Sequence, residues 1–139
     1  MSFPTSLHDT VKPVPAILPG TSVSDNTPVV SAILDTAGFE AVELVVITGT
    51  LADADATFTV LLEHGDTPTL SDAAAVADDE LVGTEAEASF TAANDNTTRK
   101  IGYRGMKRYL RATITPSGNS AAAALAAVWL LAGGRRQPV

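Results

Sequence analysis

The sequence contains no cysteine among its 139 residues. Without thiols the chain has neither a disulfide framework nor thiolate ligands for zinc, so packing and hydrogen bonds must hold its folded state. Charged residues are also sparse, at 18%, whereas apolar residues make up 45%. This balance is typical of a folded globular chain, and a chain of this length is expected to form one core.

Aromatic residues are scarce, since Phe, Trp and Tyr together reach only 5%, and much of the apolar content is alanine. Small side chains bury little area, and burial contributes about 25 cal/mol per Å². The core of a single chain is then thin, and binding to further subunits would add stability by mass action. We therefore expect a homo-oligomer.

No recognisable catalytic motif is present. The two histidines, His8 and His64, lie in no motif that pairs a base with a nucleophile, and both are expected to be surface imidazoles. Acidic residues gather at 53–55 and 78–80, but not with the spacing of a calcium loop. No glycine-rich phosphate-binding pattern occurs. We predict that the protein is not an enzyme and has no cofactor and no metal site.

Membrane and secretion signals are also lacking. Residues 1–10 have neither the basic nor the apolar segment of a secretory signal. The longest apolar run, residues 121–132, is too short to cross a bilayer. The expectation is a protein that is not secreted and has no membrane partner.

Charge is divided along the chain. All 16 acidic residues lie between Asp9 and Asp95, together with one basic residue, Lys12, and the other basic residues lie from Arg99 onward. One interpretation is that strands from the two parts alternate in a sheet and pair their charges. The other is that a basic surface of one subunit meets an acidic surface of its neighbour. The net charge of -7 disfavours nucleic acid as a partner.

Short apolar or alternating segments, separated by turn residues, follow one another from residue 27 onward. We expect an all-β single domain over residues 27–139, a β-sandwich or jelly-roll-like fold. Residues 1–26 are rich in proline, which resists helix and central strand, so they are predicted to form an extended N-terminal arm. This arm would lie free or along a sheet edge, of its own chain or of a neighbour.

Two segments are candidates for buried strands. Residues 41–50 are β-branched and almost continuously apolar, which predicts a strand covered on both sides. Residues 121–131 are rich in alanine, which favours helix, but they offer no charged solvent face. We predict a buried strand there, with Trp129 in the core or in a subunit interface.

Local turn and capping signals predict two further features. Residues 99–103 and 108–115, joined by a turn at 104–107, are expected to form a hairpin. Residues 70–76 are expected to form one or two helical turns with Ser71 as the N-cap.

Two groups of residues are candidates for contact with a partner. The segment 99–111, called here the basic segment, carries six basic residues and two tyrosines, and a structural use of it is favoured over nucleic-acid binding. Apolar residues recur at intervals in the arm. The candidates are Arg99, Lys100, Tyr103, Arg104, Lys107, Arg108 and Arg111 in the basic segment, and Val11, Val14 and Ile17 in the arm.

Three runs resemble small virion proteins of tailed bacteriophages: residues 26–40 (NTPVVSAILDTAGFE), 48–58 (TGTLADADATF) and above all 101–109 (IGYRGMKRY). The likeness covers most of residues 26–139. It implies a structural subunit of the virion, such as a capsid decoration (cement) protein that forms small oligomers, with a trimer favoured, and that binds and stabilises the outside of the head. It supplies no catalytic motif.

The partner implied by this resemblance is the major capsid protein or another virion protein. The implied location is the virion, assembled in the cytoplasm of a host bacterium. Two alternatives remain: a tail, baseplate or spike-base component, and a carbohydrate-binding β-sandwich module for host attachment. Sugar sites commonly use exposed aromatic rings, whereas Trp129, the only tryptophan, lies in the most apolar strand.

Overall fold

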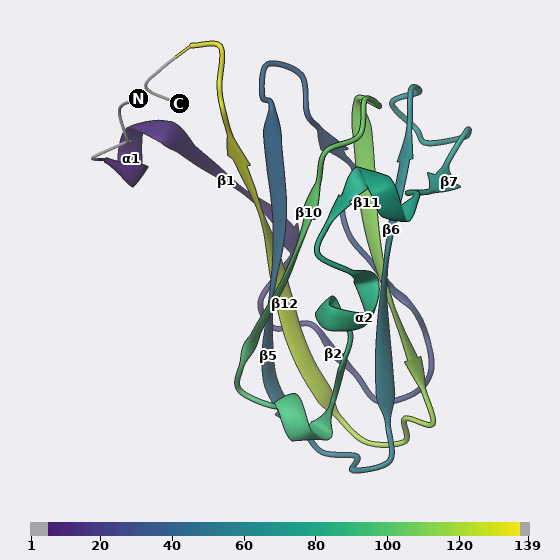
Figure 1. The fold of residues 1–139 in the computed structure, drawn as a ribbon. Helices are drawn as coiled ribbons and strands as arrows, with labels where there is room; N and C mark the ends of the chain where they lie inside the picture. Colours follow the sequence, from purple (N-terminus) through teal and green to yellow (C-terminus); the bar gives the residue numbers. More distant parts are fainter. Residues whose placement is uncertain (1–5, 137–139) are drawn as a thin grey trace.

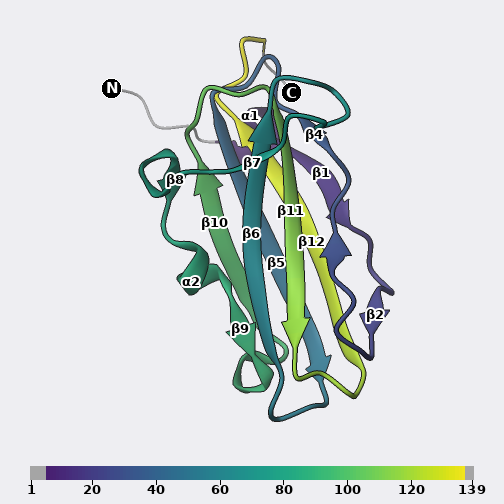
Figure 2. The ribbon, with the colours of Figure 1, turned by 90° about the vertical axis from the view of Figure 1, so that its right-hand side faces the viewer.

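Two antiparallel β-sheets pack face to face in the computed structural model, which describes residues 6–136 (Figure 1). Figure 2 shows one sheet in front of the other, with β6 and β11 before β5 and β12. The predicted all-β sandwich is therefore confirmed.

Sheet A is built around one long central strand. Within residues 6–136 its strand order is β1-β12-β5-β10-β8, with β2 also paired to β12. Strand β5 pairs antiparallel with β12 on one side and with β10 on the other. The strands of sheet A are β1 (Val11–Ile17), β2 (Ser22–Val23), β5 (Ala41–Leu51), β8 (Leu81–Val82), β10 (Thr98–Tyr103) and β12 (Ala123–Ala132).

Sheet B is centred on the long pair β6 and β11. Its order in the described chain is β3-β11-β6-β7, with β4 paired to β11 and β9 paired to β6. Between β3 and β4, Ser31 stays bonded to β11, since its amide donates to the Ala112 carbonyl at 2.8 Å and its hydroxyl accepts from the Ala112 amide at 2.9 Å. The strands of sheet B are β3 (Val29–Val30), β4 (Leu34–Asp35), β6 (Thr57–Gly65), β7 (Ala74–Ala75), β9 (Phe90–Thr91) and β11 (Tyr109–Ser117).

The core lies between the two sheets, where alternate side chains of the long strands meet. Phe58 and Phe90 stack with ring centroids 5.0 Å apart. Trp129 is 1% exposed, so the core, one of its two predicted locations, is confirmed. The largest fully buried side chains also include Leu44, Leu62, Ile101, Leu110, Ile114 and Leu131.

The strand predicted at residues 121–131 is confirmed as β12. It pairs with β5, β1 and the short β2, and both β1 and β2 belong to the segment predicted as an arm. Residues 11–17 are therefore an edge strand of this chain's own sheet, one of the two placements considered for them. Lys12 and Val14 pair with Leu131 and Trp129 in this ladder.

The hairpin predicted from residues 99–103 and 108–115 is wrong. Strand β10 pairs with β5 and β8 in sheet A, whereas β11 pairs with β6 in sheet B. The intervening residues carry the chain across the sandwich rather than around a tight turn. Gly105 serves this crossing, because a Cβ there would lie 2.5 Å from the Tyr103 hydroxyl.

The helical turns predicted at residues 70–76 are also wrong. Leu70 has a φ of 53°, and the chain then enters β7, which pairs with β6. Asp72 closes this loop instead of starting a helix, since its carboxylate accepts from the Asp66 amide at 2.8 Å and from the Thr67 hydroxyl at 2.7 Å. These bonds lower the pKa of Asp72 to about 2.

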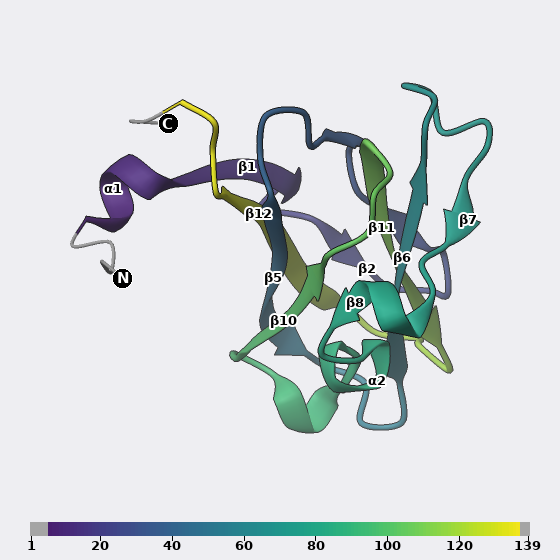
Figure 3. The ribbon, with the colours of Figure 1, turned by 45° about the horizontal axis from the view of Figure 1, so that its top comes forward.

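Short helices fill the gaps around the sheets. They are α1 (Leu7–Thr10), α2 (Glu85–Ala88) and the 3-10 turns η1 (Asp78–Glu80) and η2 (Ala92–Asn94). Helix α2 lies between β6 and β10, while α1 stands apart at the start of β1 (Figure 3). None of the helices in residues 6–136 has the length and apolar character needed to cross a membrane.

Helix α2 also protects an edge of β6. The Val60 amide donates to the Ser89 hydroxyl at 3.0 Å, and the Leu62 amide donates to the Glu85 carboxylate at 3.1 Å. Side chains thus take the hydrogen bonds that a further strand would otherwise make there.

Two neighbouring leucines of β6 offer a test of the sandwich. Leu62 is fully buried between the sheets, whereas Leu61 is half-buried on the outer side of sheet B. Leu62→Ala is expected to lower the free energy of unfolding by about 2–5 kcal/mol, because it leaves a cavity. Leu61→Ala is the control and should cost about 1 kcal/mol or less. Urea unfolding measures both, and equal losses would contradict the assigned faces.

Candidate functional site

The side of sheet A that points away from the core is unusually apolar. We call it the outer face and define it by the residues that the strand registers place there. They are Val11, Pro13 and Pro15 of β1; Ala126, Val128, Leu130 and Ala132 of β12; Ala41, Glu43, Val45 and Ile47 of β5; Thr98, Lys100 and Gly102 of β10; and Val82 of β8.

Residues 41–50 were expected to be covered on both sides, and this expectation is wrong. The inward residues of β5 are buried, but the outward ones are half-buried or exposed. Ile47 is 49% exposed, and Val82 at the edge of the same face is 53% exposed. In residues 6–136, no segment covers the outer face.

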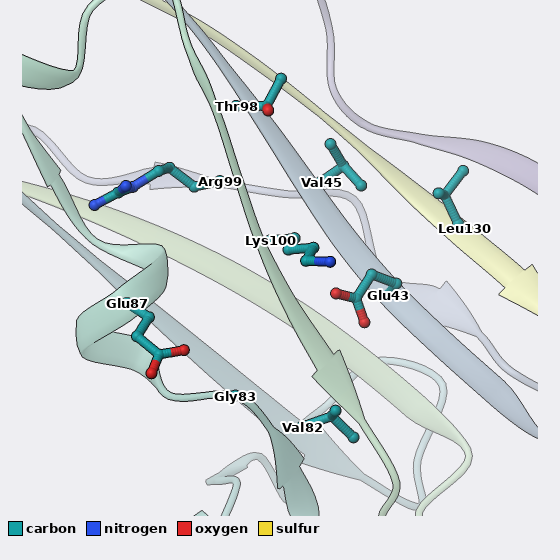
Figure 4. Close-up of a pocket in the computed structure, with 9 residues that line it drawn as sticks. All are labelled: Glu43, Val45, Val82, Gly83, Glu87, Thr98, Arg99, Lys100 and Leu130. Atoms are coloured by element: carbon teal, nitrogen blue, oxygen red, sulfur yellow. The ribbon is translucent and has the colours of Figure 1, made fainter.

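A hollow of about 700 Å³ lies in this face, between β5, β10 and β8 (Figure 4). Val45, Val82 and Leu130 contribute its apolar walls. Gly102 provides part of its depth, since a Cβ on this residue would lie 2.5 Å from a carboxylate oxygen of Glu43 and 2.8 Å from the Cβ of Val82. The Glu43 side chain therefore lies across the strand at the glycine.

A second hollow, of about 430 Å³, continues the outer face toward the end of β1. It shares Glu43, Val82 and Leu130 with the first hollow and reaches Val11 and Arg104. The two hollows thus form one uneven, mainly apolar surface over β5, β12 and the short strand β8.

Glu43 and Lys100 are the charged residues of the outer face. Burial raises the pKa of the Glu43 carboxyl above its usual value of 4.5, and the positive charge of Lys100 opposes this rise. Figure 4 shows the Lys100 side chain pointing toward Glu43. The outer face therefore carries one acid and one base on neighbouring strands, within apolar surroundings.

Three basic residues of the basic segment are paired inside the chain. Lys107 Nζ lies 2.8 Å from Asp66, and Arg108 contacts both carboxylate oxygens of Asp35 at 2.8 and 2.9 Å. Arg111 lies 3.1 Å from Glu63, its direct partner across β11 and β6. Arg111 and Glu63 thus show the first interpretation of the charge division, pairing between strands from the two parts of the chain. Lys107 and Arg108 pair with acids of the first part from the crossing between β10 and β11.

Arg99, Tyr103 and Arg104 are also used within the fold. The Arg99 guanidinium donates to the Ser89 carbonyl at 3.1 Å, and Arg104 Nε donates to the Asp79 carbonyl at 3.0 Å. The hydroxyl of Tyr103 lies 2.8 Å from His64 Nδ1. His64 is 8% exposed, so its expected position at the surface is wrong, because this bond between the sheets holds it inside.

The arm candidates have different positions. Ile17 is buried at 5% exposure in the core, and Val14 packs partly against the same core. Val11 pairs with Ala132 on the outer face and lines the second hollow. Of the predicted contact residues, Val11 and Lys100 belong to the outer face, and Arg104 lies at its margin.

The acidic loops have structural roles. Asp53 accepts hydrogen bonds from the amides of Asp55 and Ser120 at 3.0 and 2.8 Å, and residues 78–80 form η1. Among residues 6–136, no group of three or more metal-binding side chains has an arrangement that could hold an ion.

The apolar residues of the outer face were missed as a site. A signal was present, because β5 and β12 lack the apolar-polar alternation of a strand with one wet face. That pattern indicates two faces that avoid water, but not whether the second is covered by the same chain or by another one.

No protein-family model matches the chain, and no curated protein matches it. Solved structures with a similar path of strands include the CBM22-1 and GH10 modules of xylanase 10B from Clostridium thermocellum, at 9% identity and a TM-score of 0.46. Others are dimeric latent PorU from Porphyromonas gingivalis, at 13% and 0.44, and the xylan-binding module CBM15, at 11% and 0.44.

The matches cover 93%, 95% and 92% of this chain, in the same order. They span 27% of the xylanase chain, 13% of PorU and 99% of the CBM15 module. The functional inference therefore depends on the chain's own residues.

Replacing Glu43 with Gln tests the electrostatics of the outer face. A carboxyl whose pKa is higher in the folded than in the unfolded state destabilises the fold as pH rises through the folded pKa. Glu43→Gln should therefore raise the free energy of unfolding at neutral pH, and this gain should vanish below pH 4.5. Urea unfolding of dilute protein across this pH range measures the gain. Glu40→Gln, at an exposed position, is the control, and a loss of stability at neutral pH would contradict the assignment.

Proposed function

We propose that the protein is a structural subunit that works by assembling with other protein, and that the outer face of sheet A is one of its contact surfaces. The observation that carries this proposal is the exposure of apolar residues along the central strands of a sheet. Contiguous exposed apolar surface on a folded domain marks an interaction site. The core residues on the other side of β5 are fully buried, so the fold does not need the outer face for its own core.

The proposed assembly is a bacteriophage virion, and the proposed role is that of a capsid decoration protein on the outside of the head. This step is supported by the resemblance of residues 26–40, 48–58 and 101–109 to small virion proteins of tailed phages. In the fold, residues 101–109 make the crossing between the sheets. A tail, baseplate or spike-base subunit is the alternative within the same class.

The basic segment contributes less to this proposal than its charge suggests. Lys107, Arg108 and Arg111 are engaged by acids of the same chain. Any partner that bound these side chains would have to replace existing ion pairs. The outer face has no such competition, which makes it the stronger contact surface.

Carbohydrate binding is the competing function from a different class. Sugars commonly stack on exposed aromatic rings. Trp129, Phe58 and Phe90 are at most 2% exposed, so their rings are inside the sandwich. A glycan array decides between the classes, because specific binding to a sugar would favour an attachment module over a structural subunit.

Capsid binding tests the proposed role directly. Bare capsids built from the major capsid protein of the same genome should gain resistance to heat when the purified protein is added, because a bound subunit stabilises the state that it binds. Light scattering during heating, with and without the protein, measures the gain.

An unrelated acidic protein of equal charge is the control in this experiment. Absence of binding at any ratio would remove the capsid role. Gold-labelled protein found only on tails in electron micrographs would assign it to the tail instead.

A further inference from the structure

The outer face carries its own electrostatic complement. Its acid, Glu43, lies on β5, and its base, Lys100, lies on the neighbouring strand β10, displaced by two positions along the ladder. We propose that the outer face binds the outer face of a second copy of this chain across a two-fold axis, with Glu43 of each copy opposite Lys100 of the other. This inference rests on the proposed function and names the partner of that surface.

A two-fold axis makes the same patch serve both copies, so each contact occurs twice. An axis that lies in the plane of contact and passes between Glu43 and Lys100 places each carboxylate opposite an ammonium group. The surrounding side chains of both copies are apolar, including Val45, Val128 and Leu130. Two such sheets can pack face to face as the layers of a sandwich do.

The charge of the chain favours the same surface. With a net charge of -7, two copies repel each other over most orientations. The outer face has one charge of each sign, and therefore no net charge of its own. The hollows in this face are also lined by Glu40, Glu87, Arg99 and Arg104, which again are two acids and two bases. Two copies therefore repel each other less through this surface than over most of the molecule.

Glu43 gives a second reason for a cationic group opposite this site. Its carboxylate is already partly removed from water, which raises its pKa. Further burial by a purely apolar partner would remove both Glu43 and its neighbour Lys100 from water with no added hydrogen bond or charge to offset the loss, which is unfavourable. A second copy places its own Lys100 opposite Glu43, so each carboxylate gains a further cationic neighbour as the face is covered.

Two stretches along the sheet edges, β1 in sheet A and β6 beside helix α2 in sheet B, are poor sites for self-association by strand addition. Strand β1 carries Pro13 and Pro15, which have no amide proton to donate to an added strand. Two amides on the exposed side of β6 are already bonded to Ser89 and Glu85. Strand addition is therefore blocked at these edges, whereas association through the outer face is not.

Charge exchange between copies tests the pairing. Glu43→Lys places two lysines opposite each other in a pair of identical copies, and Lys100→Glu places two glutamates there. Each variant alone should associate at least about tenfold more weakly than the parent, because like charges in contact are costly. An equimolar mixture of the two variants should form hetero-pairs, since every contact then joins Lys to Glu.

Sedimentation equilibrium across a concentration series measures the association, and circular dichroism with thermal unfolding checks that each variant is folded. The double variant E43K/K100E should associate like the parent. Asp55→Lys is the matched control, since it makes the same change at an exposed loop position away from the face. It should leave association unchanged.

The inference is overturned if the single variants associate as the parent does, if the mixture forms no hetero-pairs, or if the parent is a monomer or the trimer expected from the sequence. Failure of this inference and failure of the proposed function would give different results. A monomer or trimer that still protects capsids from heat would retain the structural role and remove only the two-fold pair. A two-fold pair that binds no capsid would retain this inference and remove the proposed capsid role.

Discussion

The alternation of side chains along β5 and β12 is the constraint on which the rest of the structure depends. One set of residues, including Leu44 and Trp129, packs toward sheet B and forms the core. The other set, including Val45 and Val128, is nearly as apolar and points the opposite way. A shift of one residue in the pairing register of these strands would exchange the two sets of side chains. Because both sets are apolar, hydrophobicity alone opposes such a shift only weakly. Glu43 opposes it strongly, because the shift would bury its charge in the core.

The divided charge of the sequence follows from how the sandwich is assembled. Late strands pair with early strands in both sheets, so bases from the second part meet acids from the first, as Arg111 meets Glu63. Exposed pairs of this kind contribute at most about 1 kcal/mol each. Their main effect is on register, since a shifted β11 would place Arg111 away from its partner.

Sequence patterns predicted the features that depend on burial along one strand. The strand at β12 could be predicted because a helix of that composition would have had no charged side for solvent. The failed predictions concern contacts that the burial pattern of a single strand does not record. Ser71 and Asp72 have the character of a helix start, but Asp72 bonds to Asp66 and Thr67 instead. Competing local hydrogen bonds of this kind have no distinctive sequence signal.

The hairpin prediction failed for a related reason. Gly105 indicates a special backbone position, which was interpreted as a tight turn, whereas it makes room for Tyr103. The bond from Tyr103 to His64 joins residues 39 positions apart and connects the two sheets. Because that bond depends on the packing of both sheets, turn chemistry alone cannot reveal it. The outer face was missed because the sequence pattern of an apolar strand does not depend on what covers its second face. The same pattern occurs when that face is covered by the same chain and when it is covered by another.

The protected edges and the open face together limit how this subunit can join an assembly. Natural sheets avoid uncontrolled pairing by placing prolines or side-chain bonds at their edges, as at Pro13, Pro15 and Ser89 here. A face is a more selective surface than an edge, because any extended chain can extend a ladder, whereas only a complementary shape and charge pattern can cover a face. In the proposed assembly the chain would thus leave exposed the kind of surface that discriminates between partners, because covering Glu43 and Lys100 disfavours a partner that brings no charges to meet them.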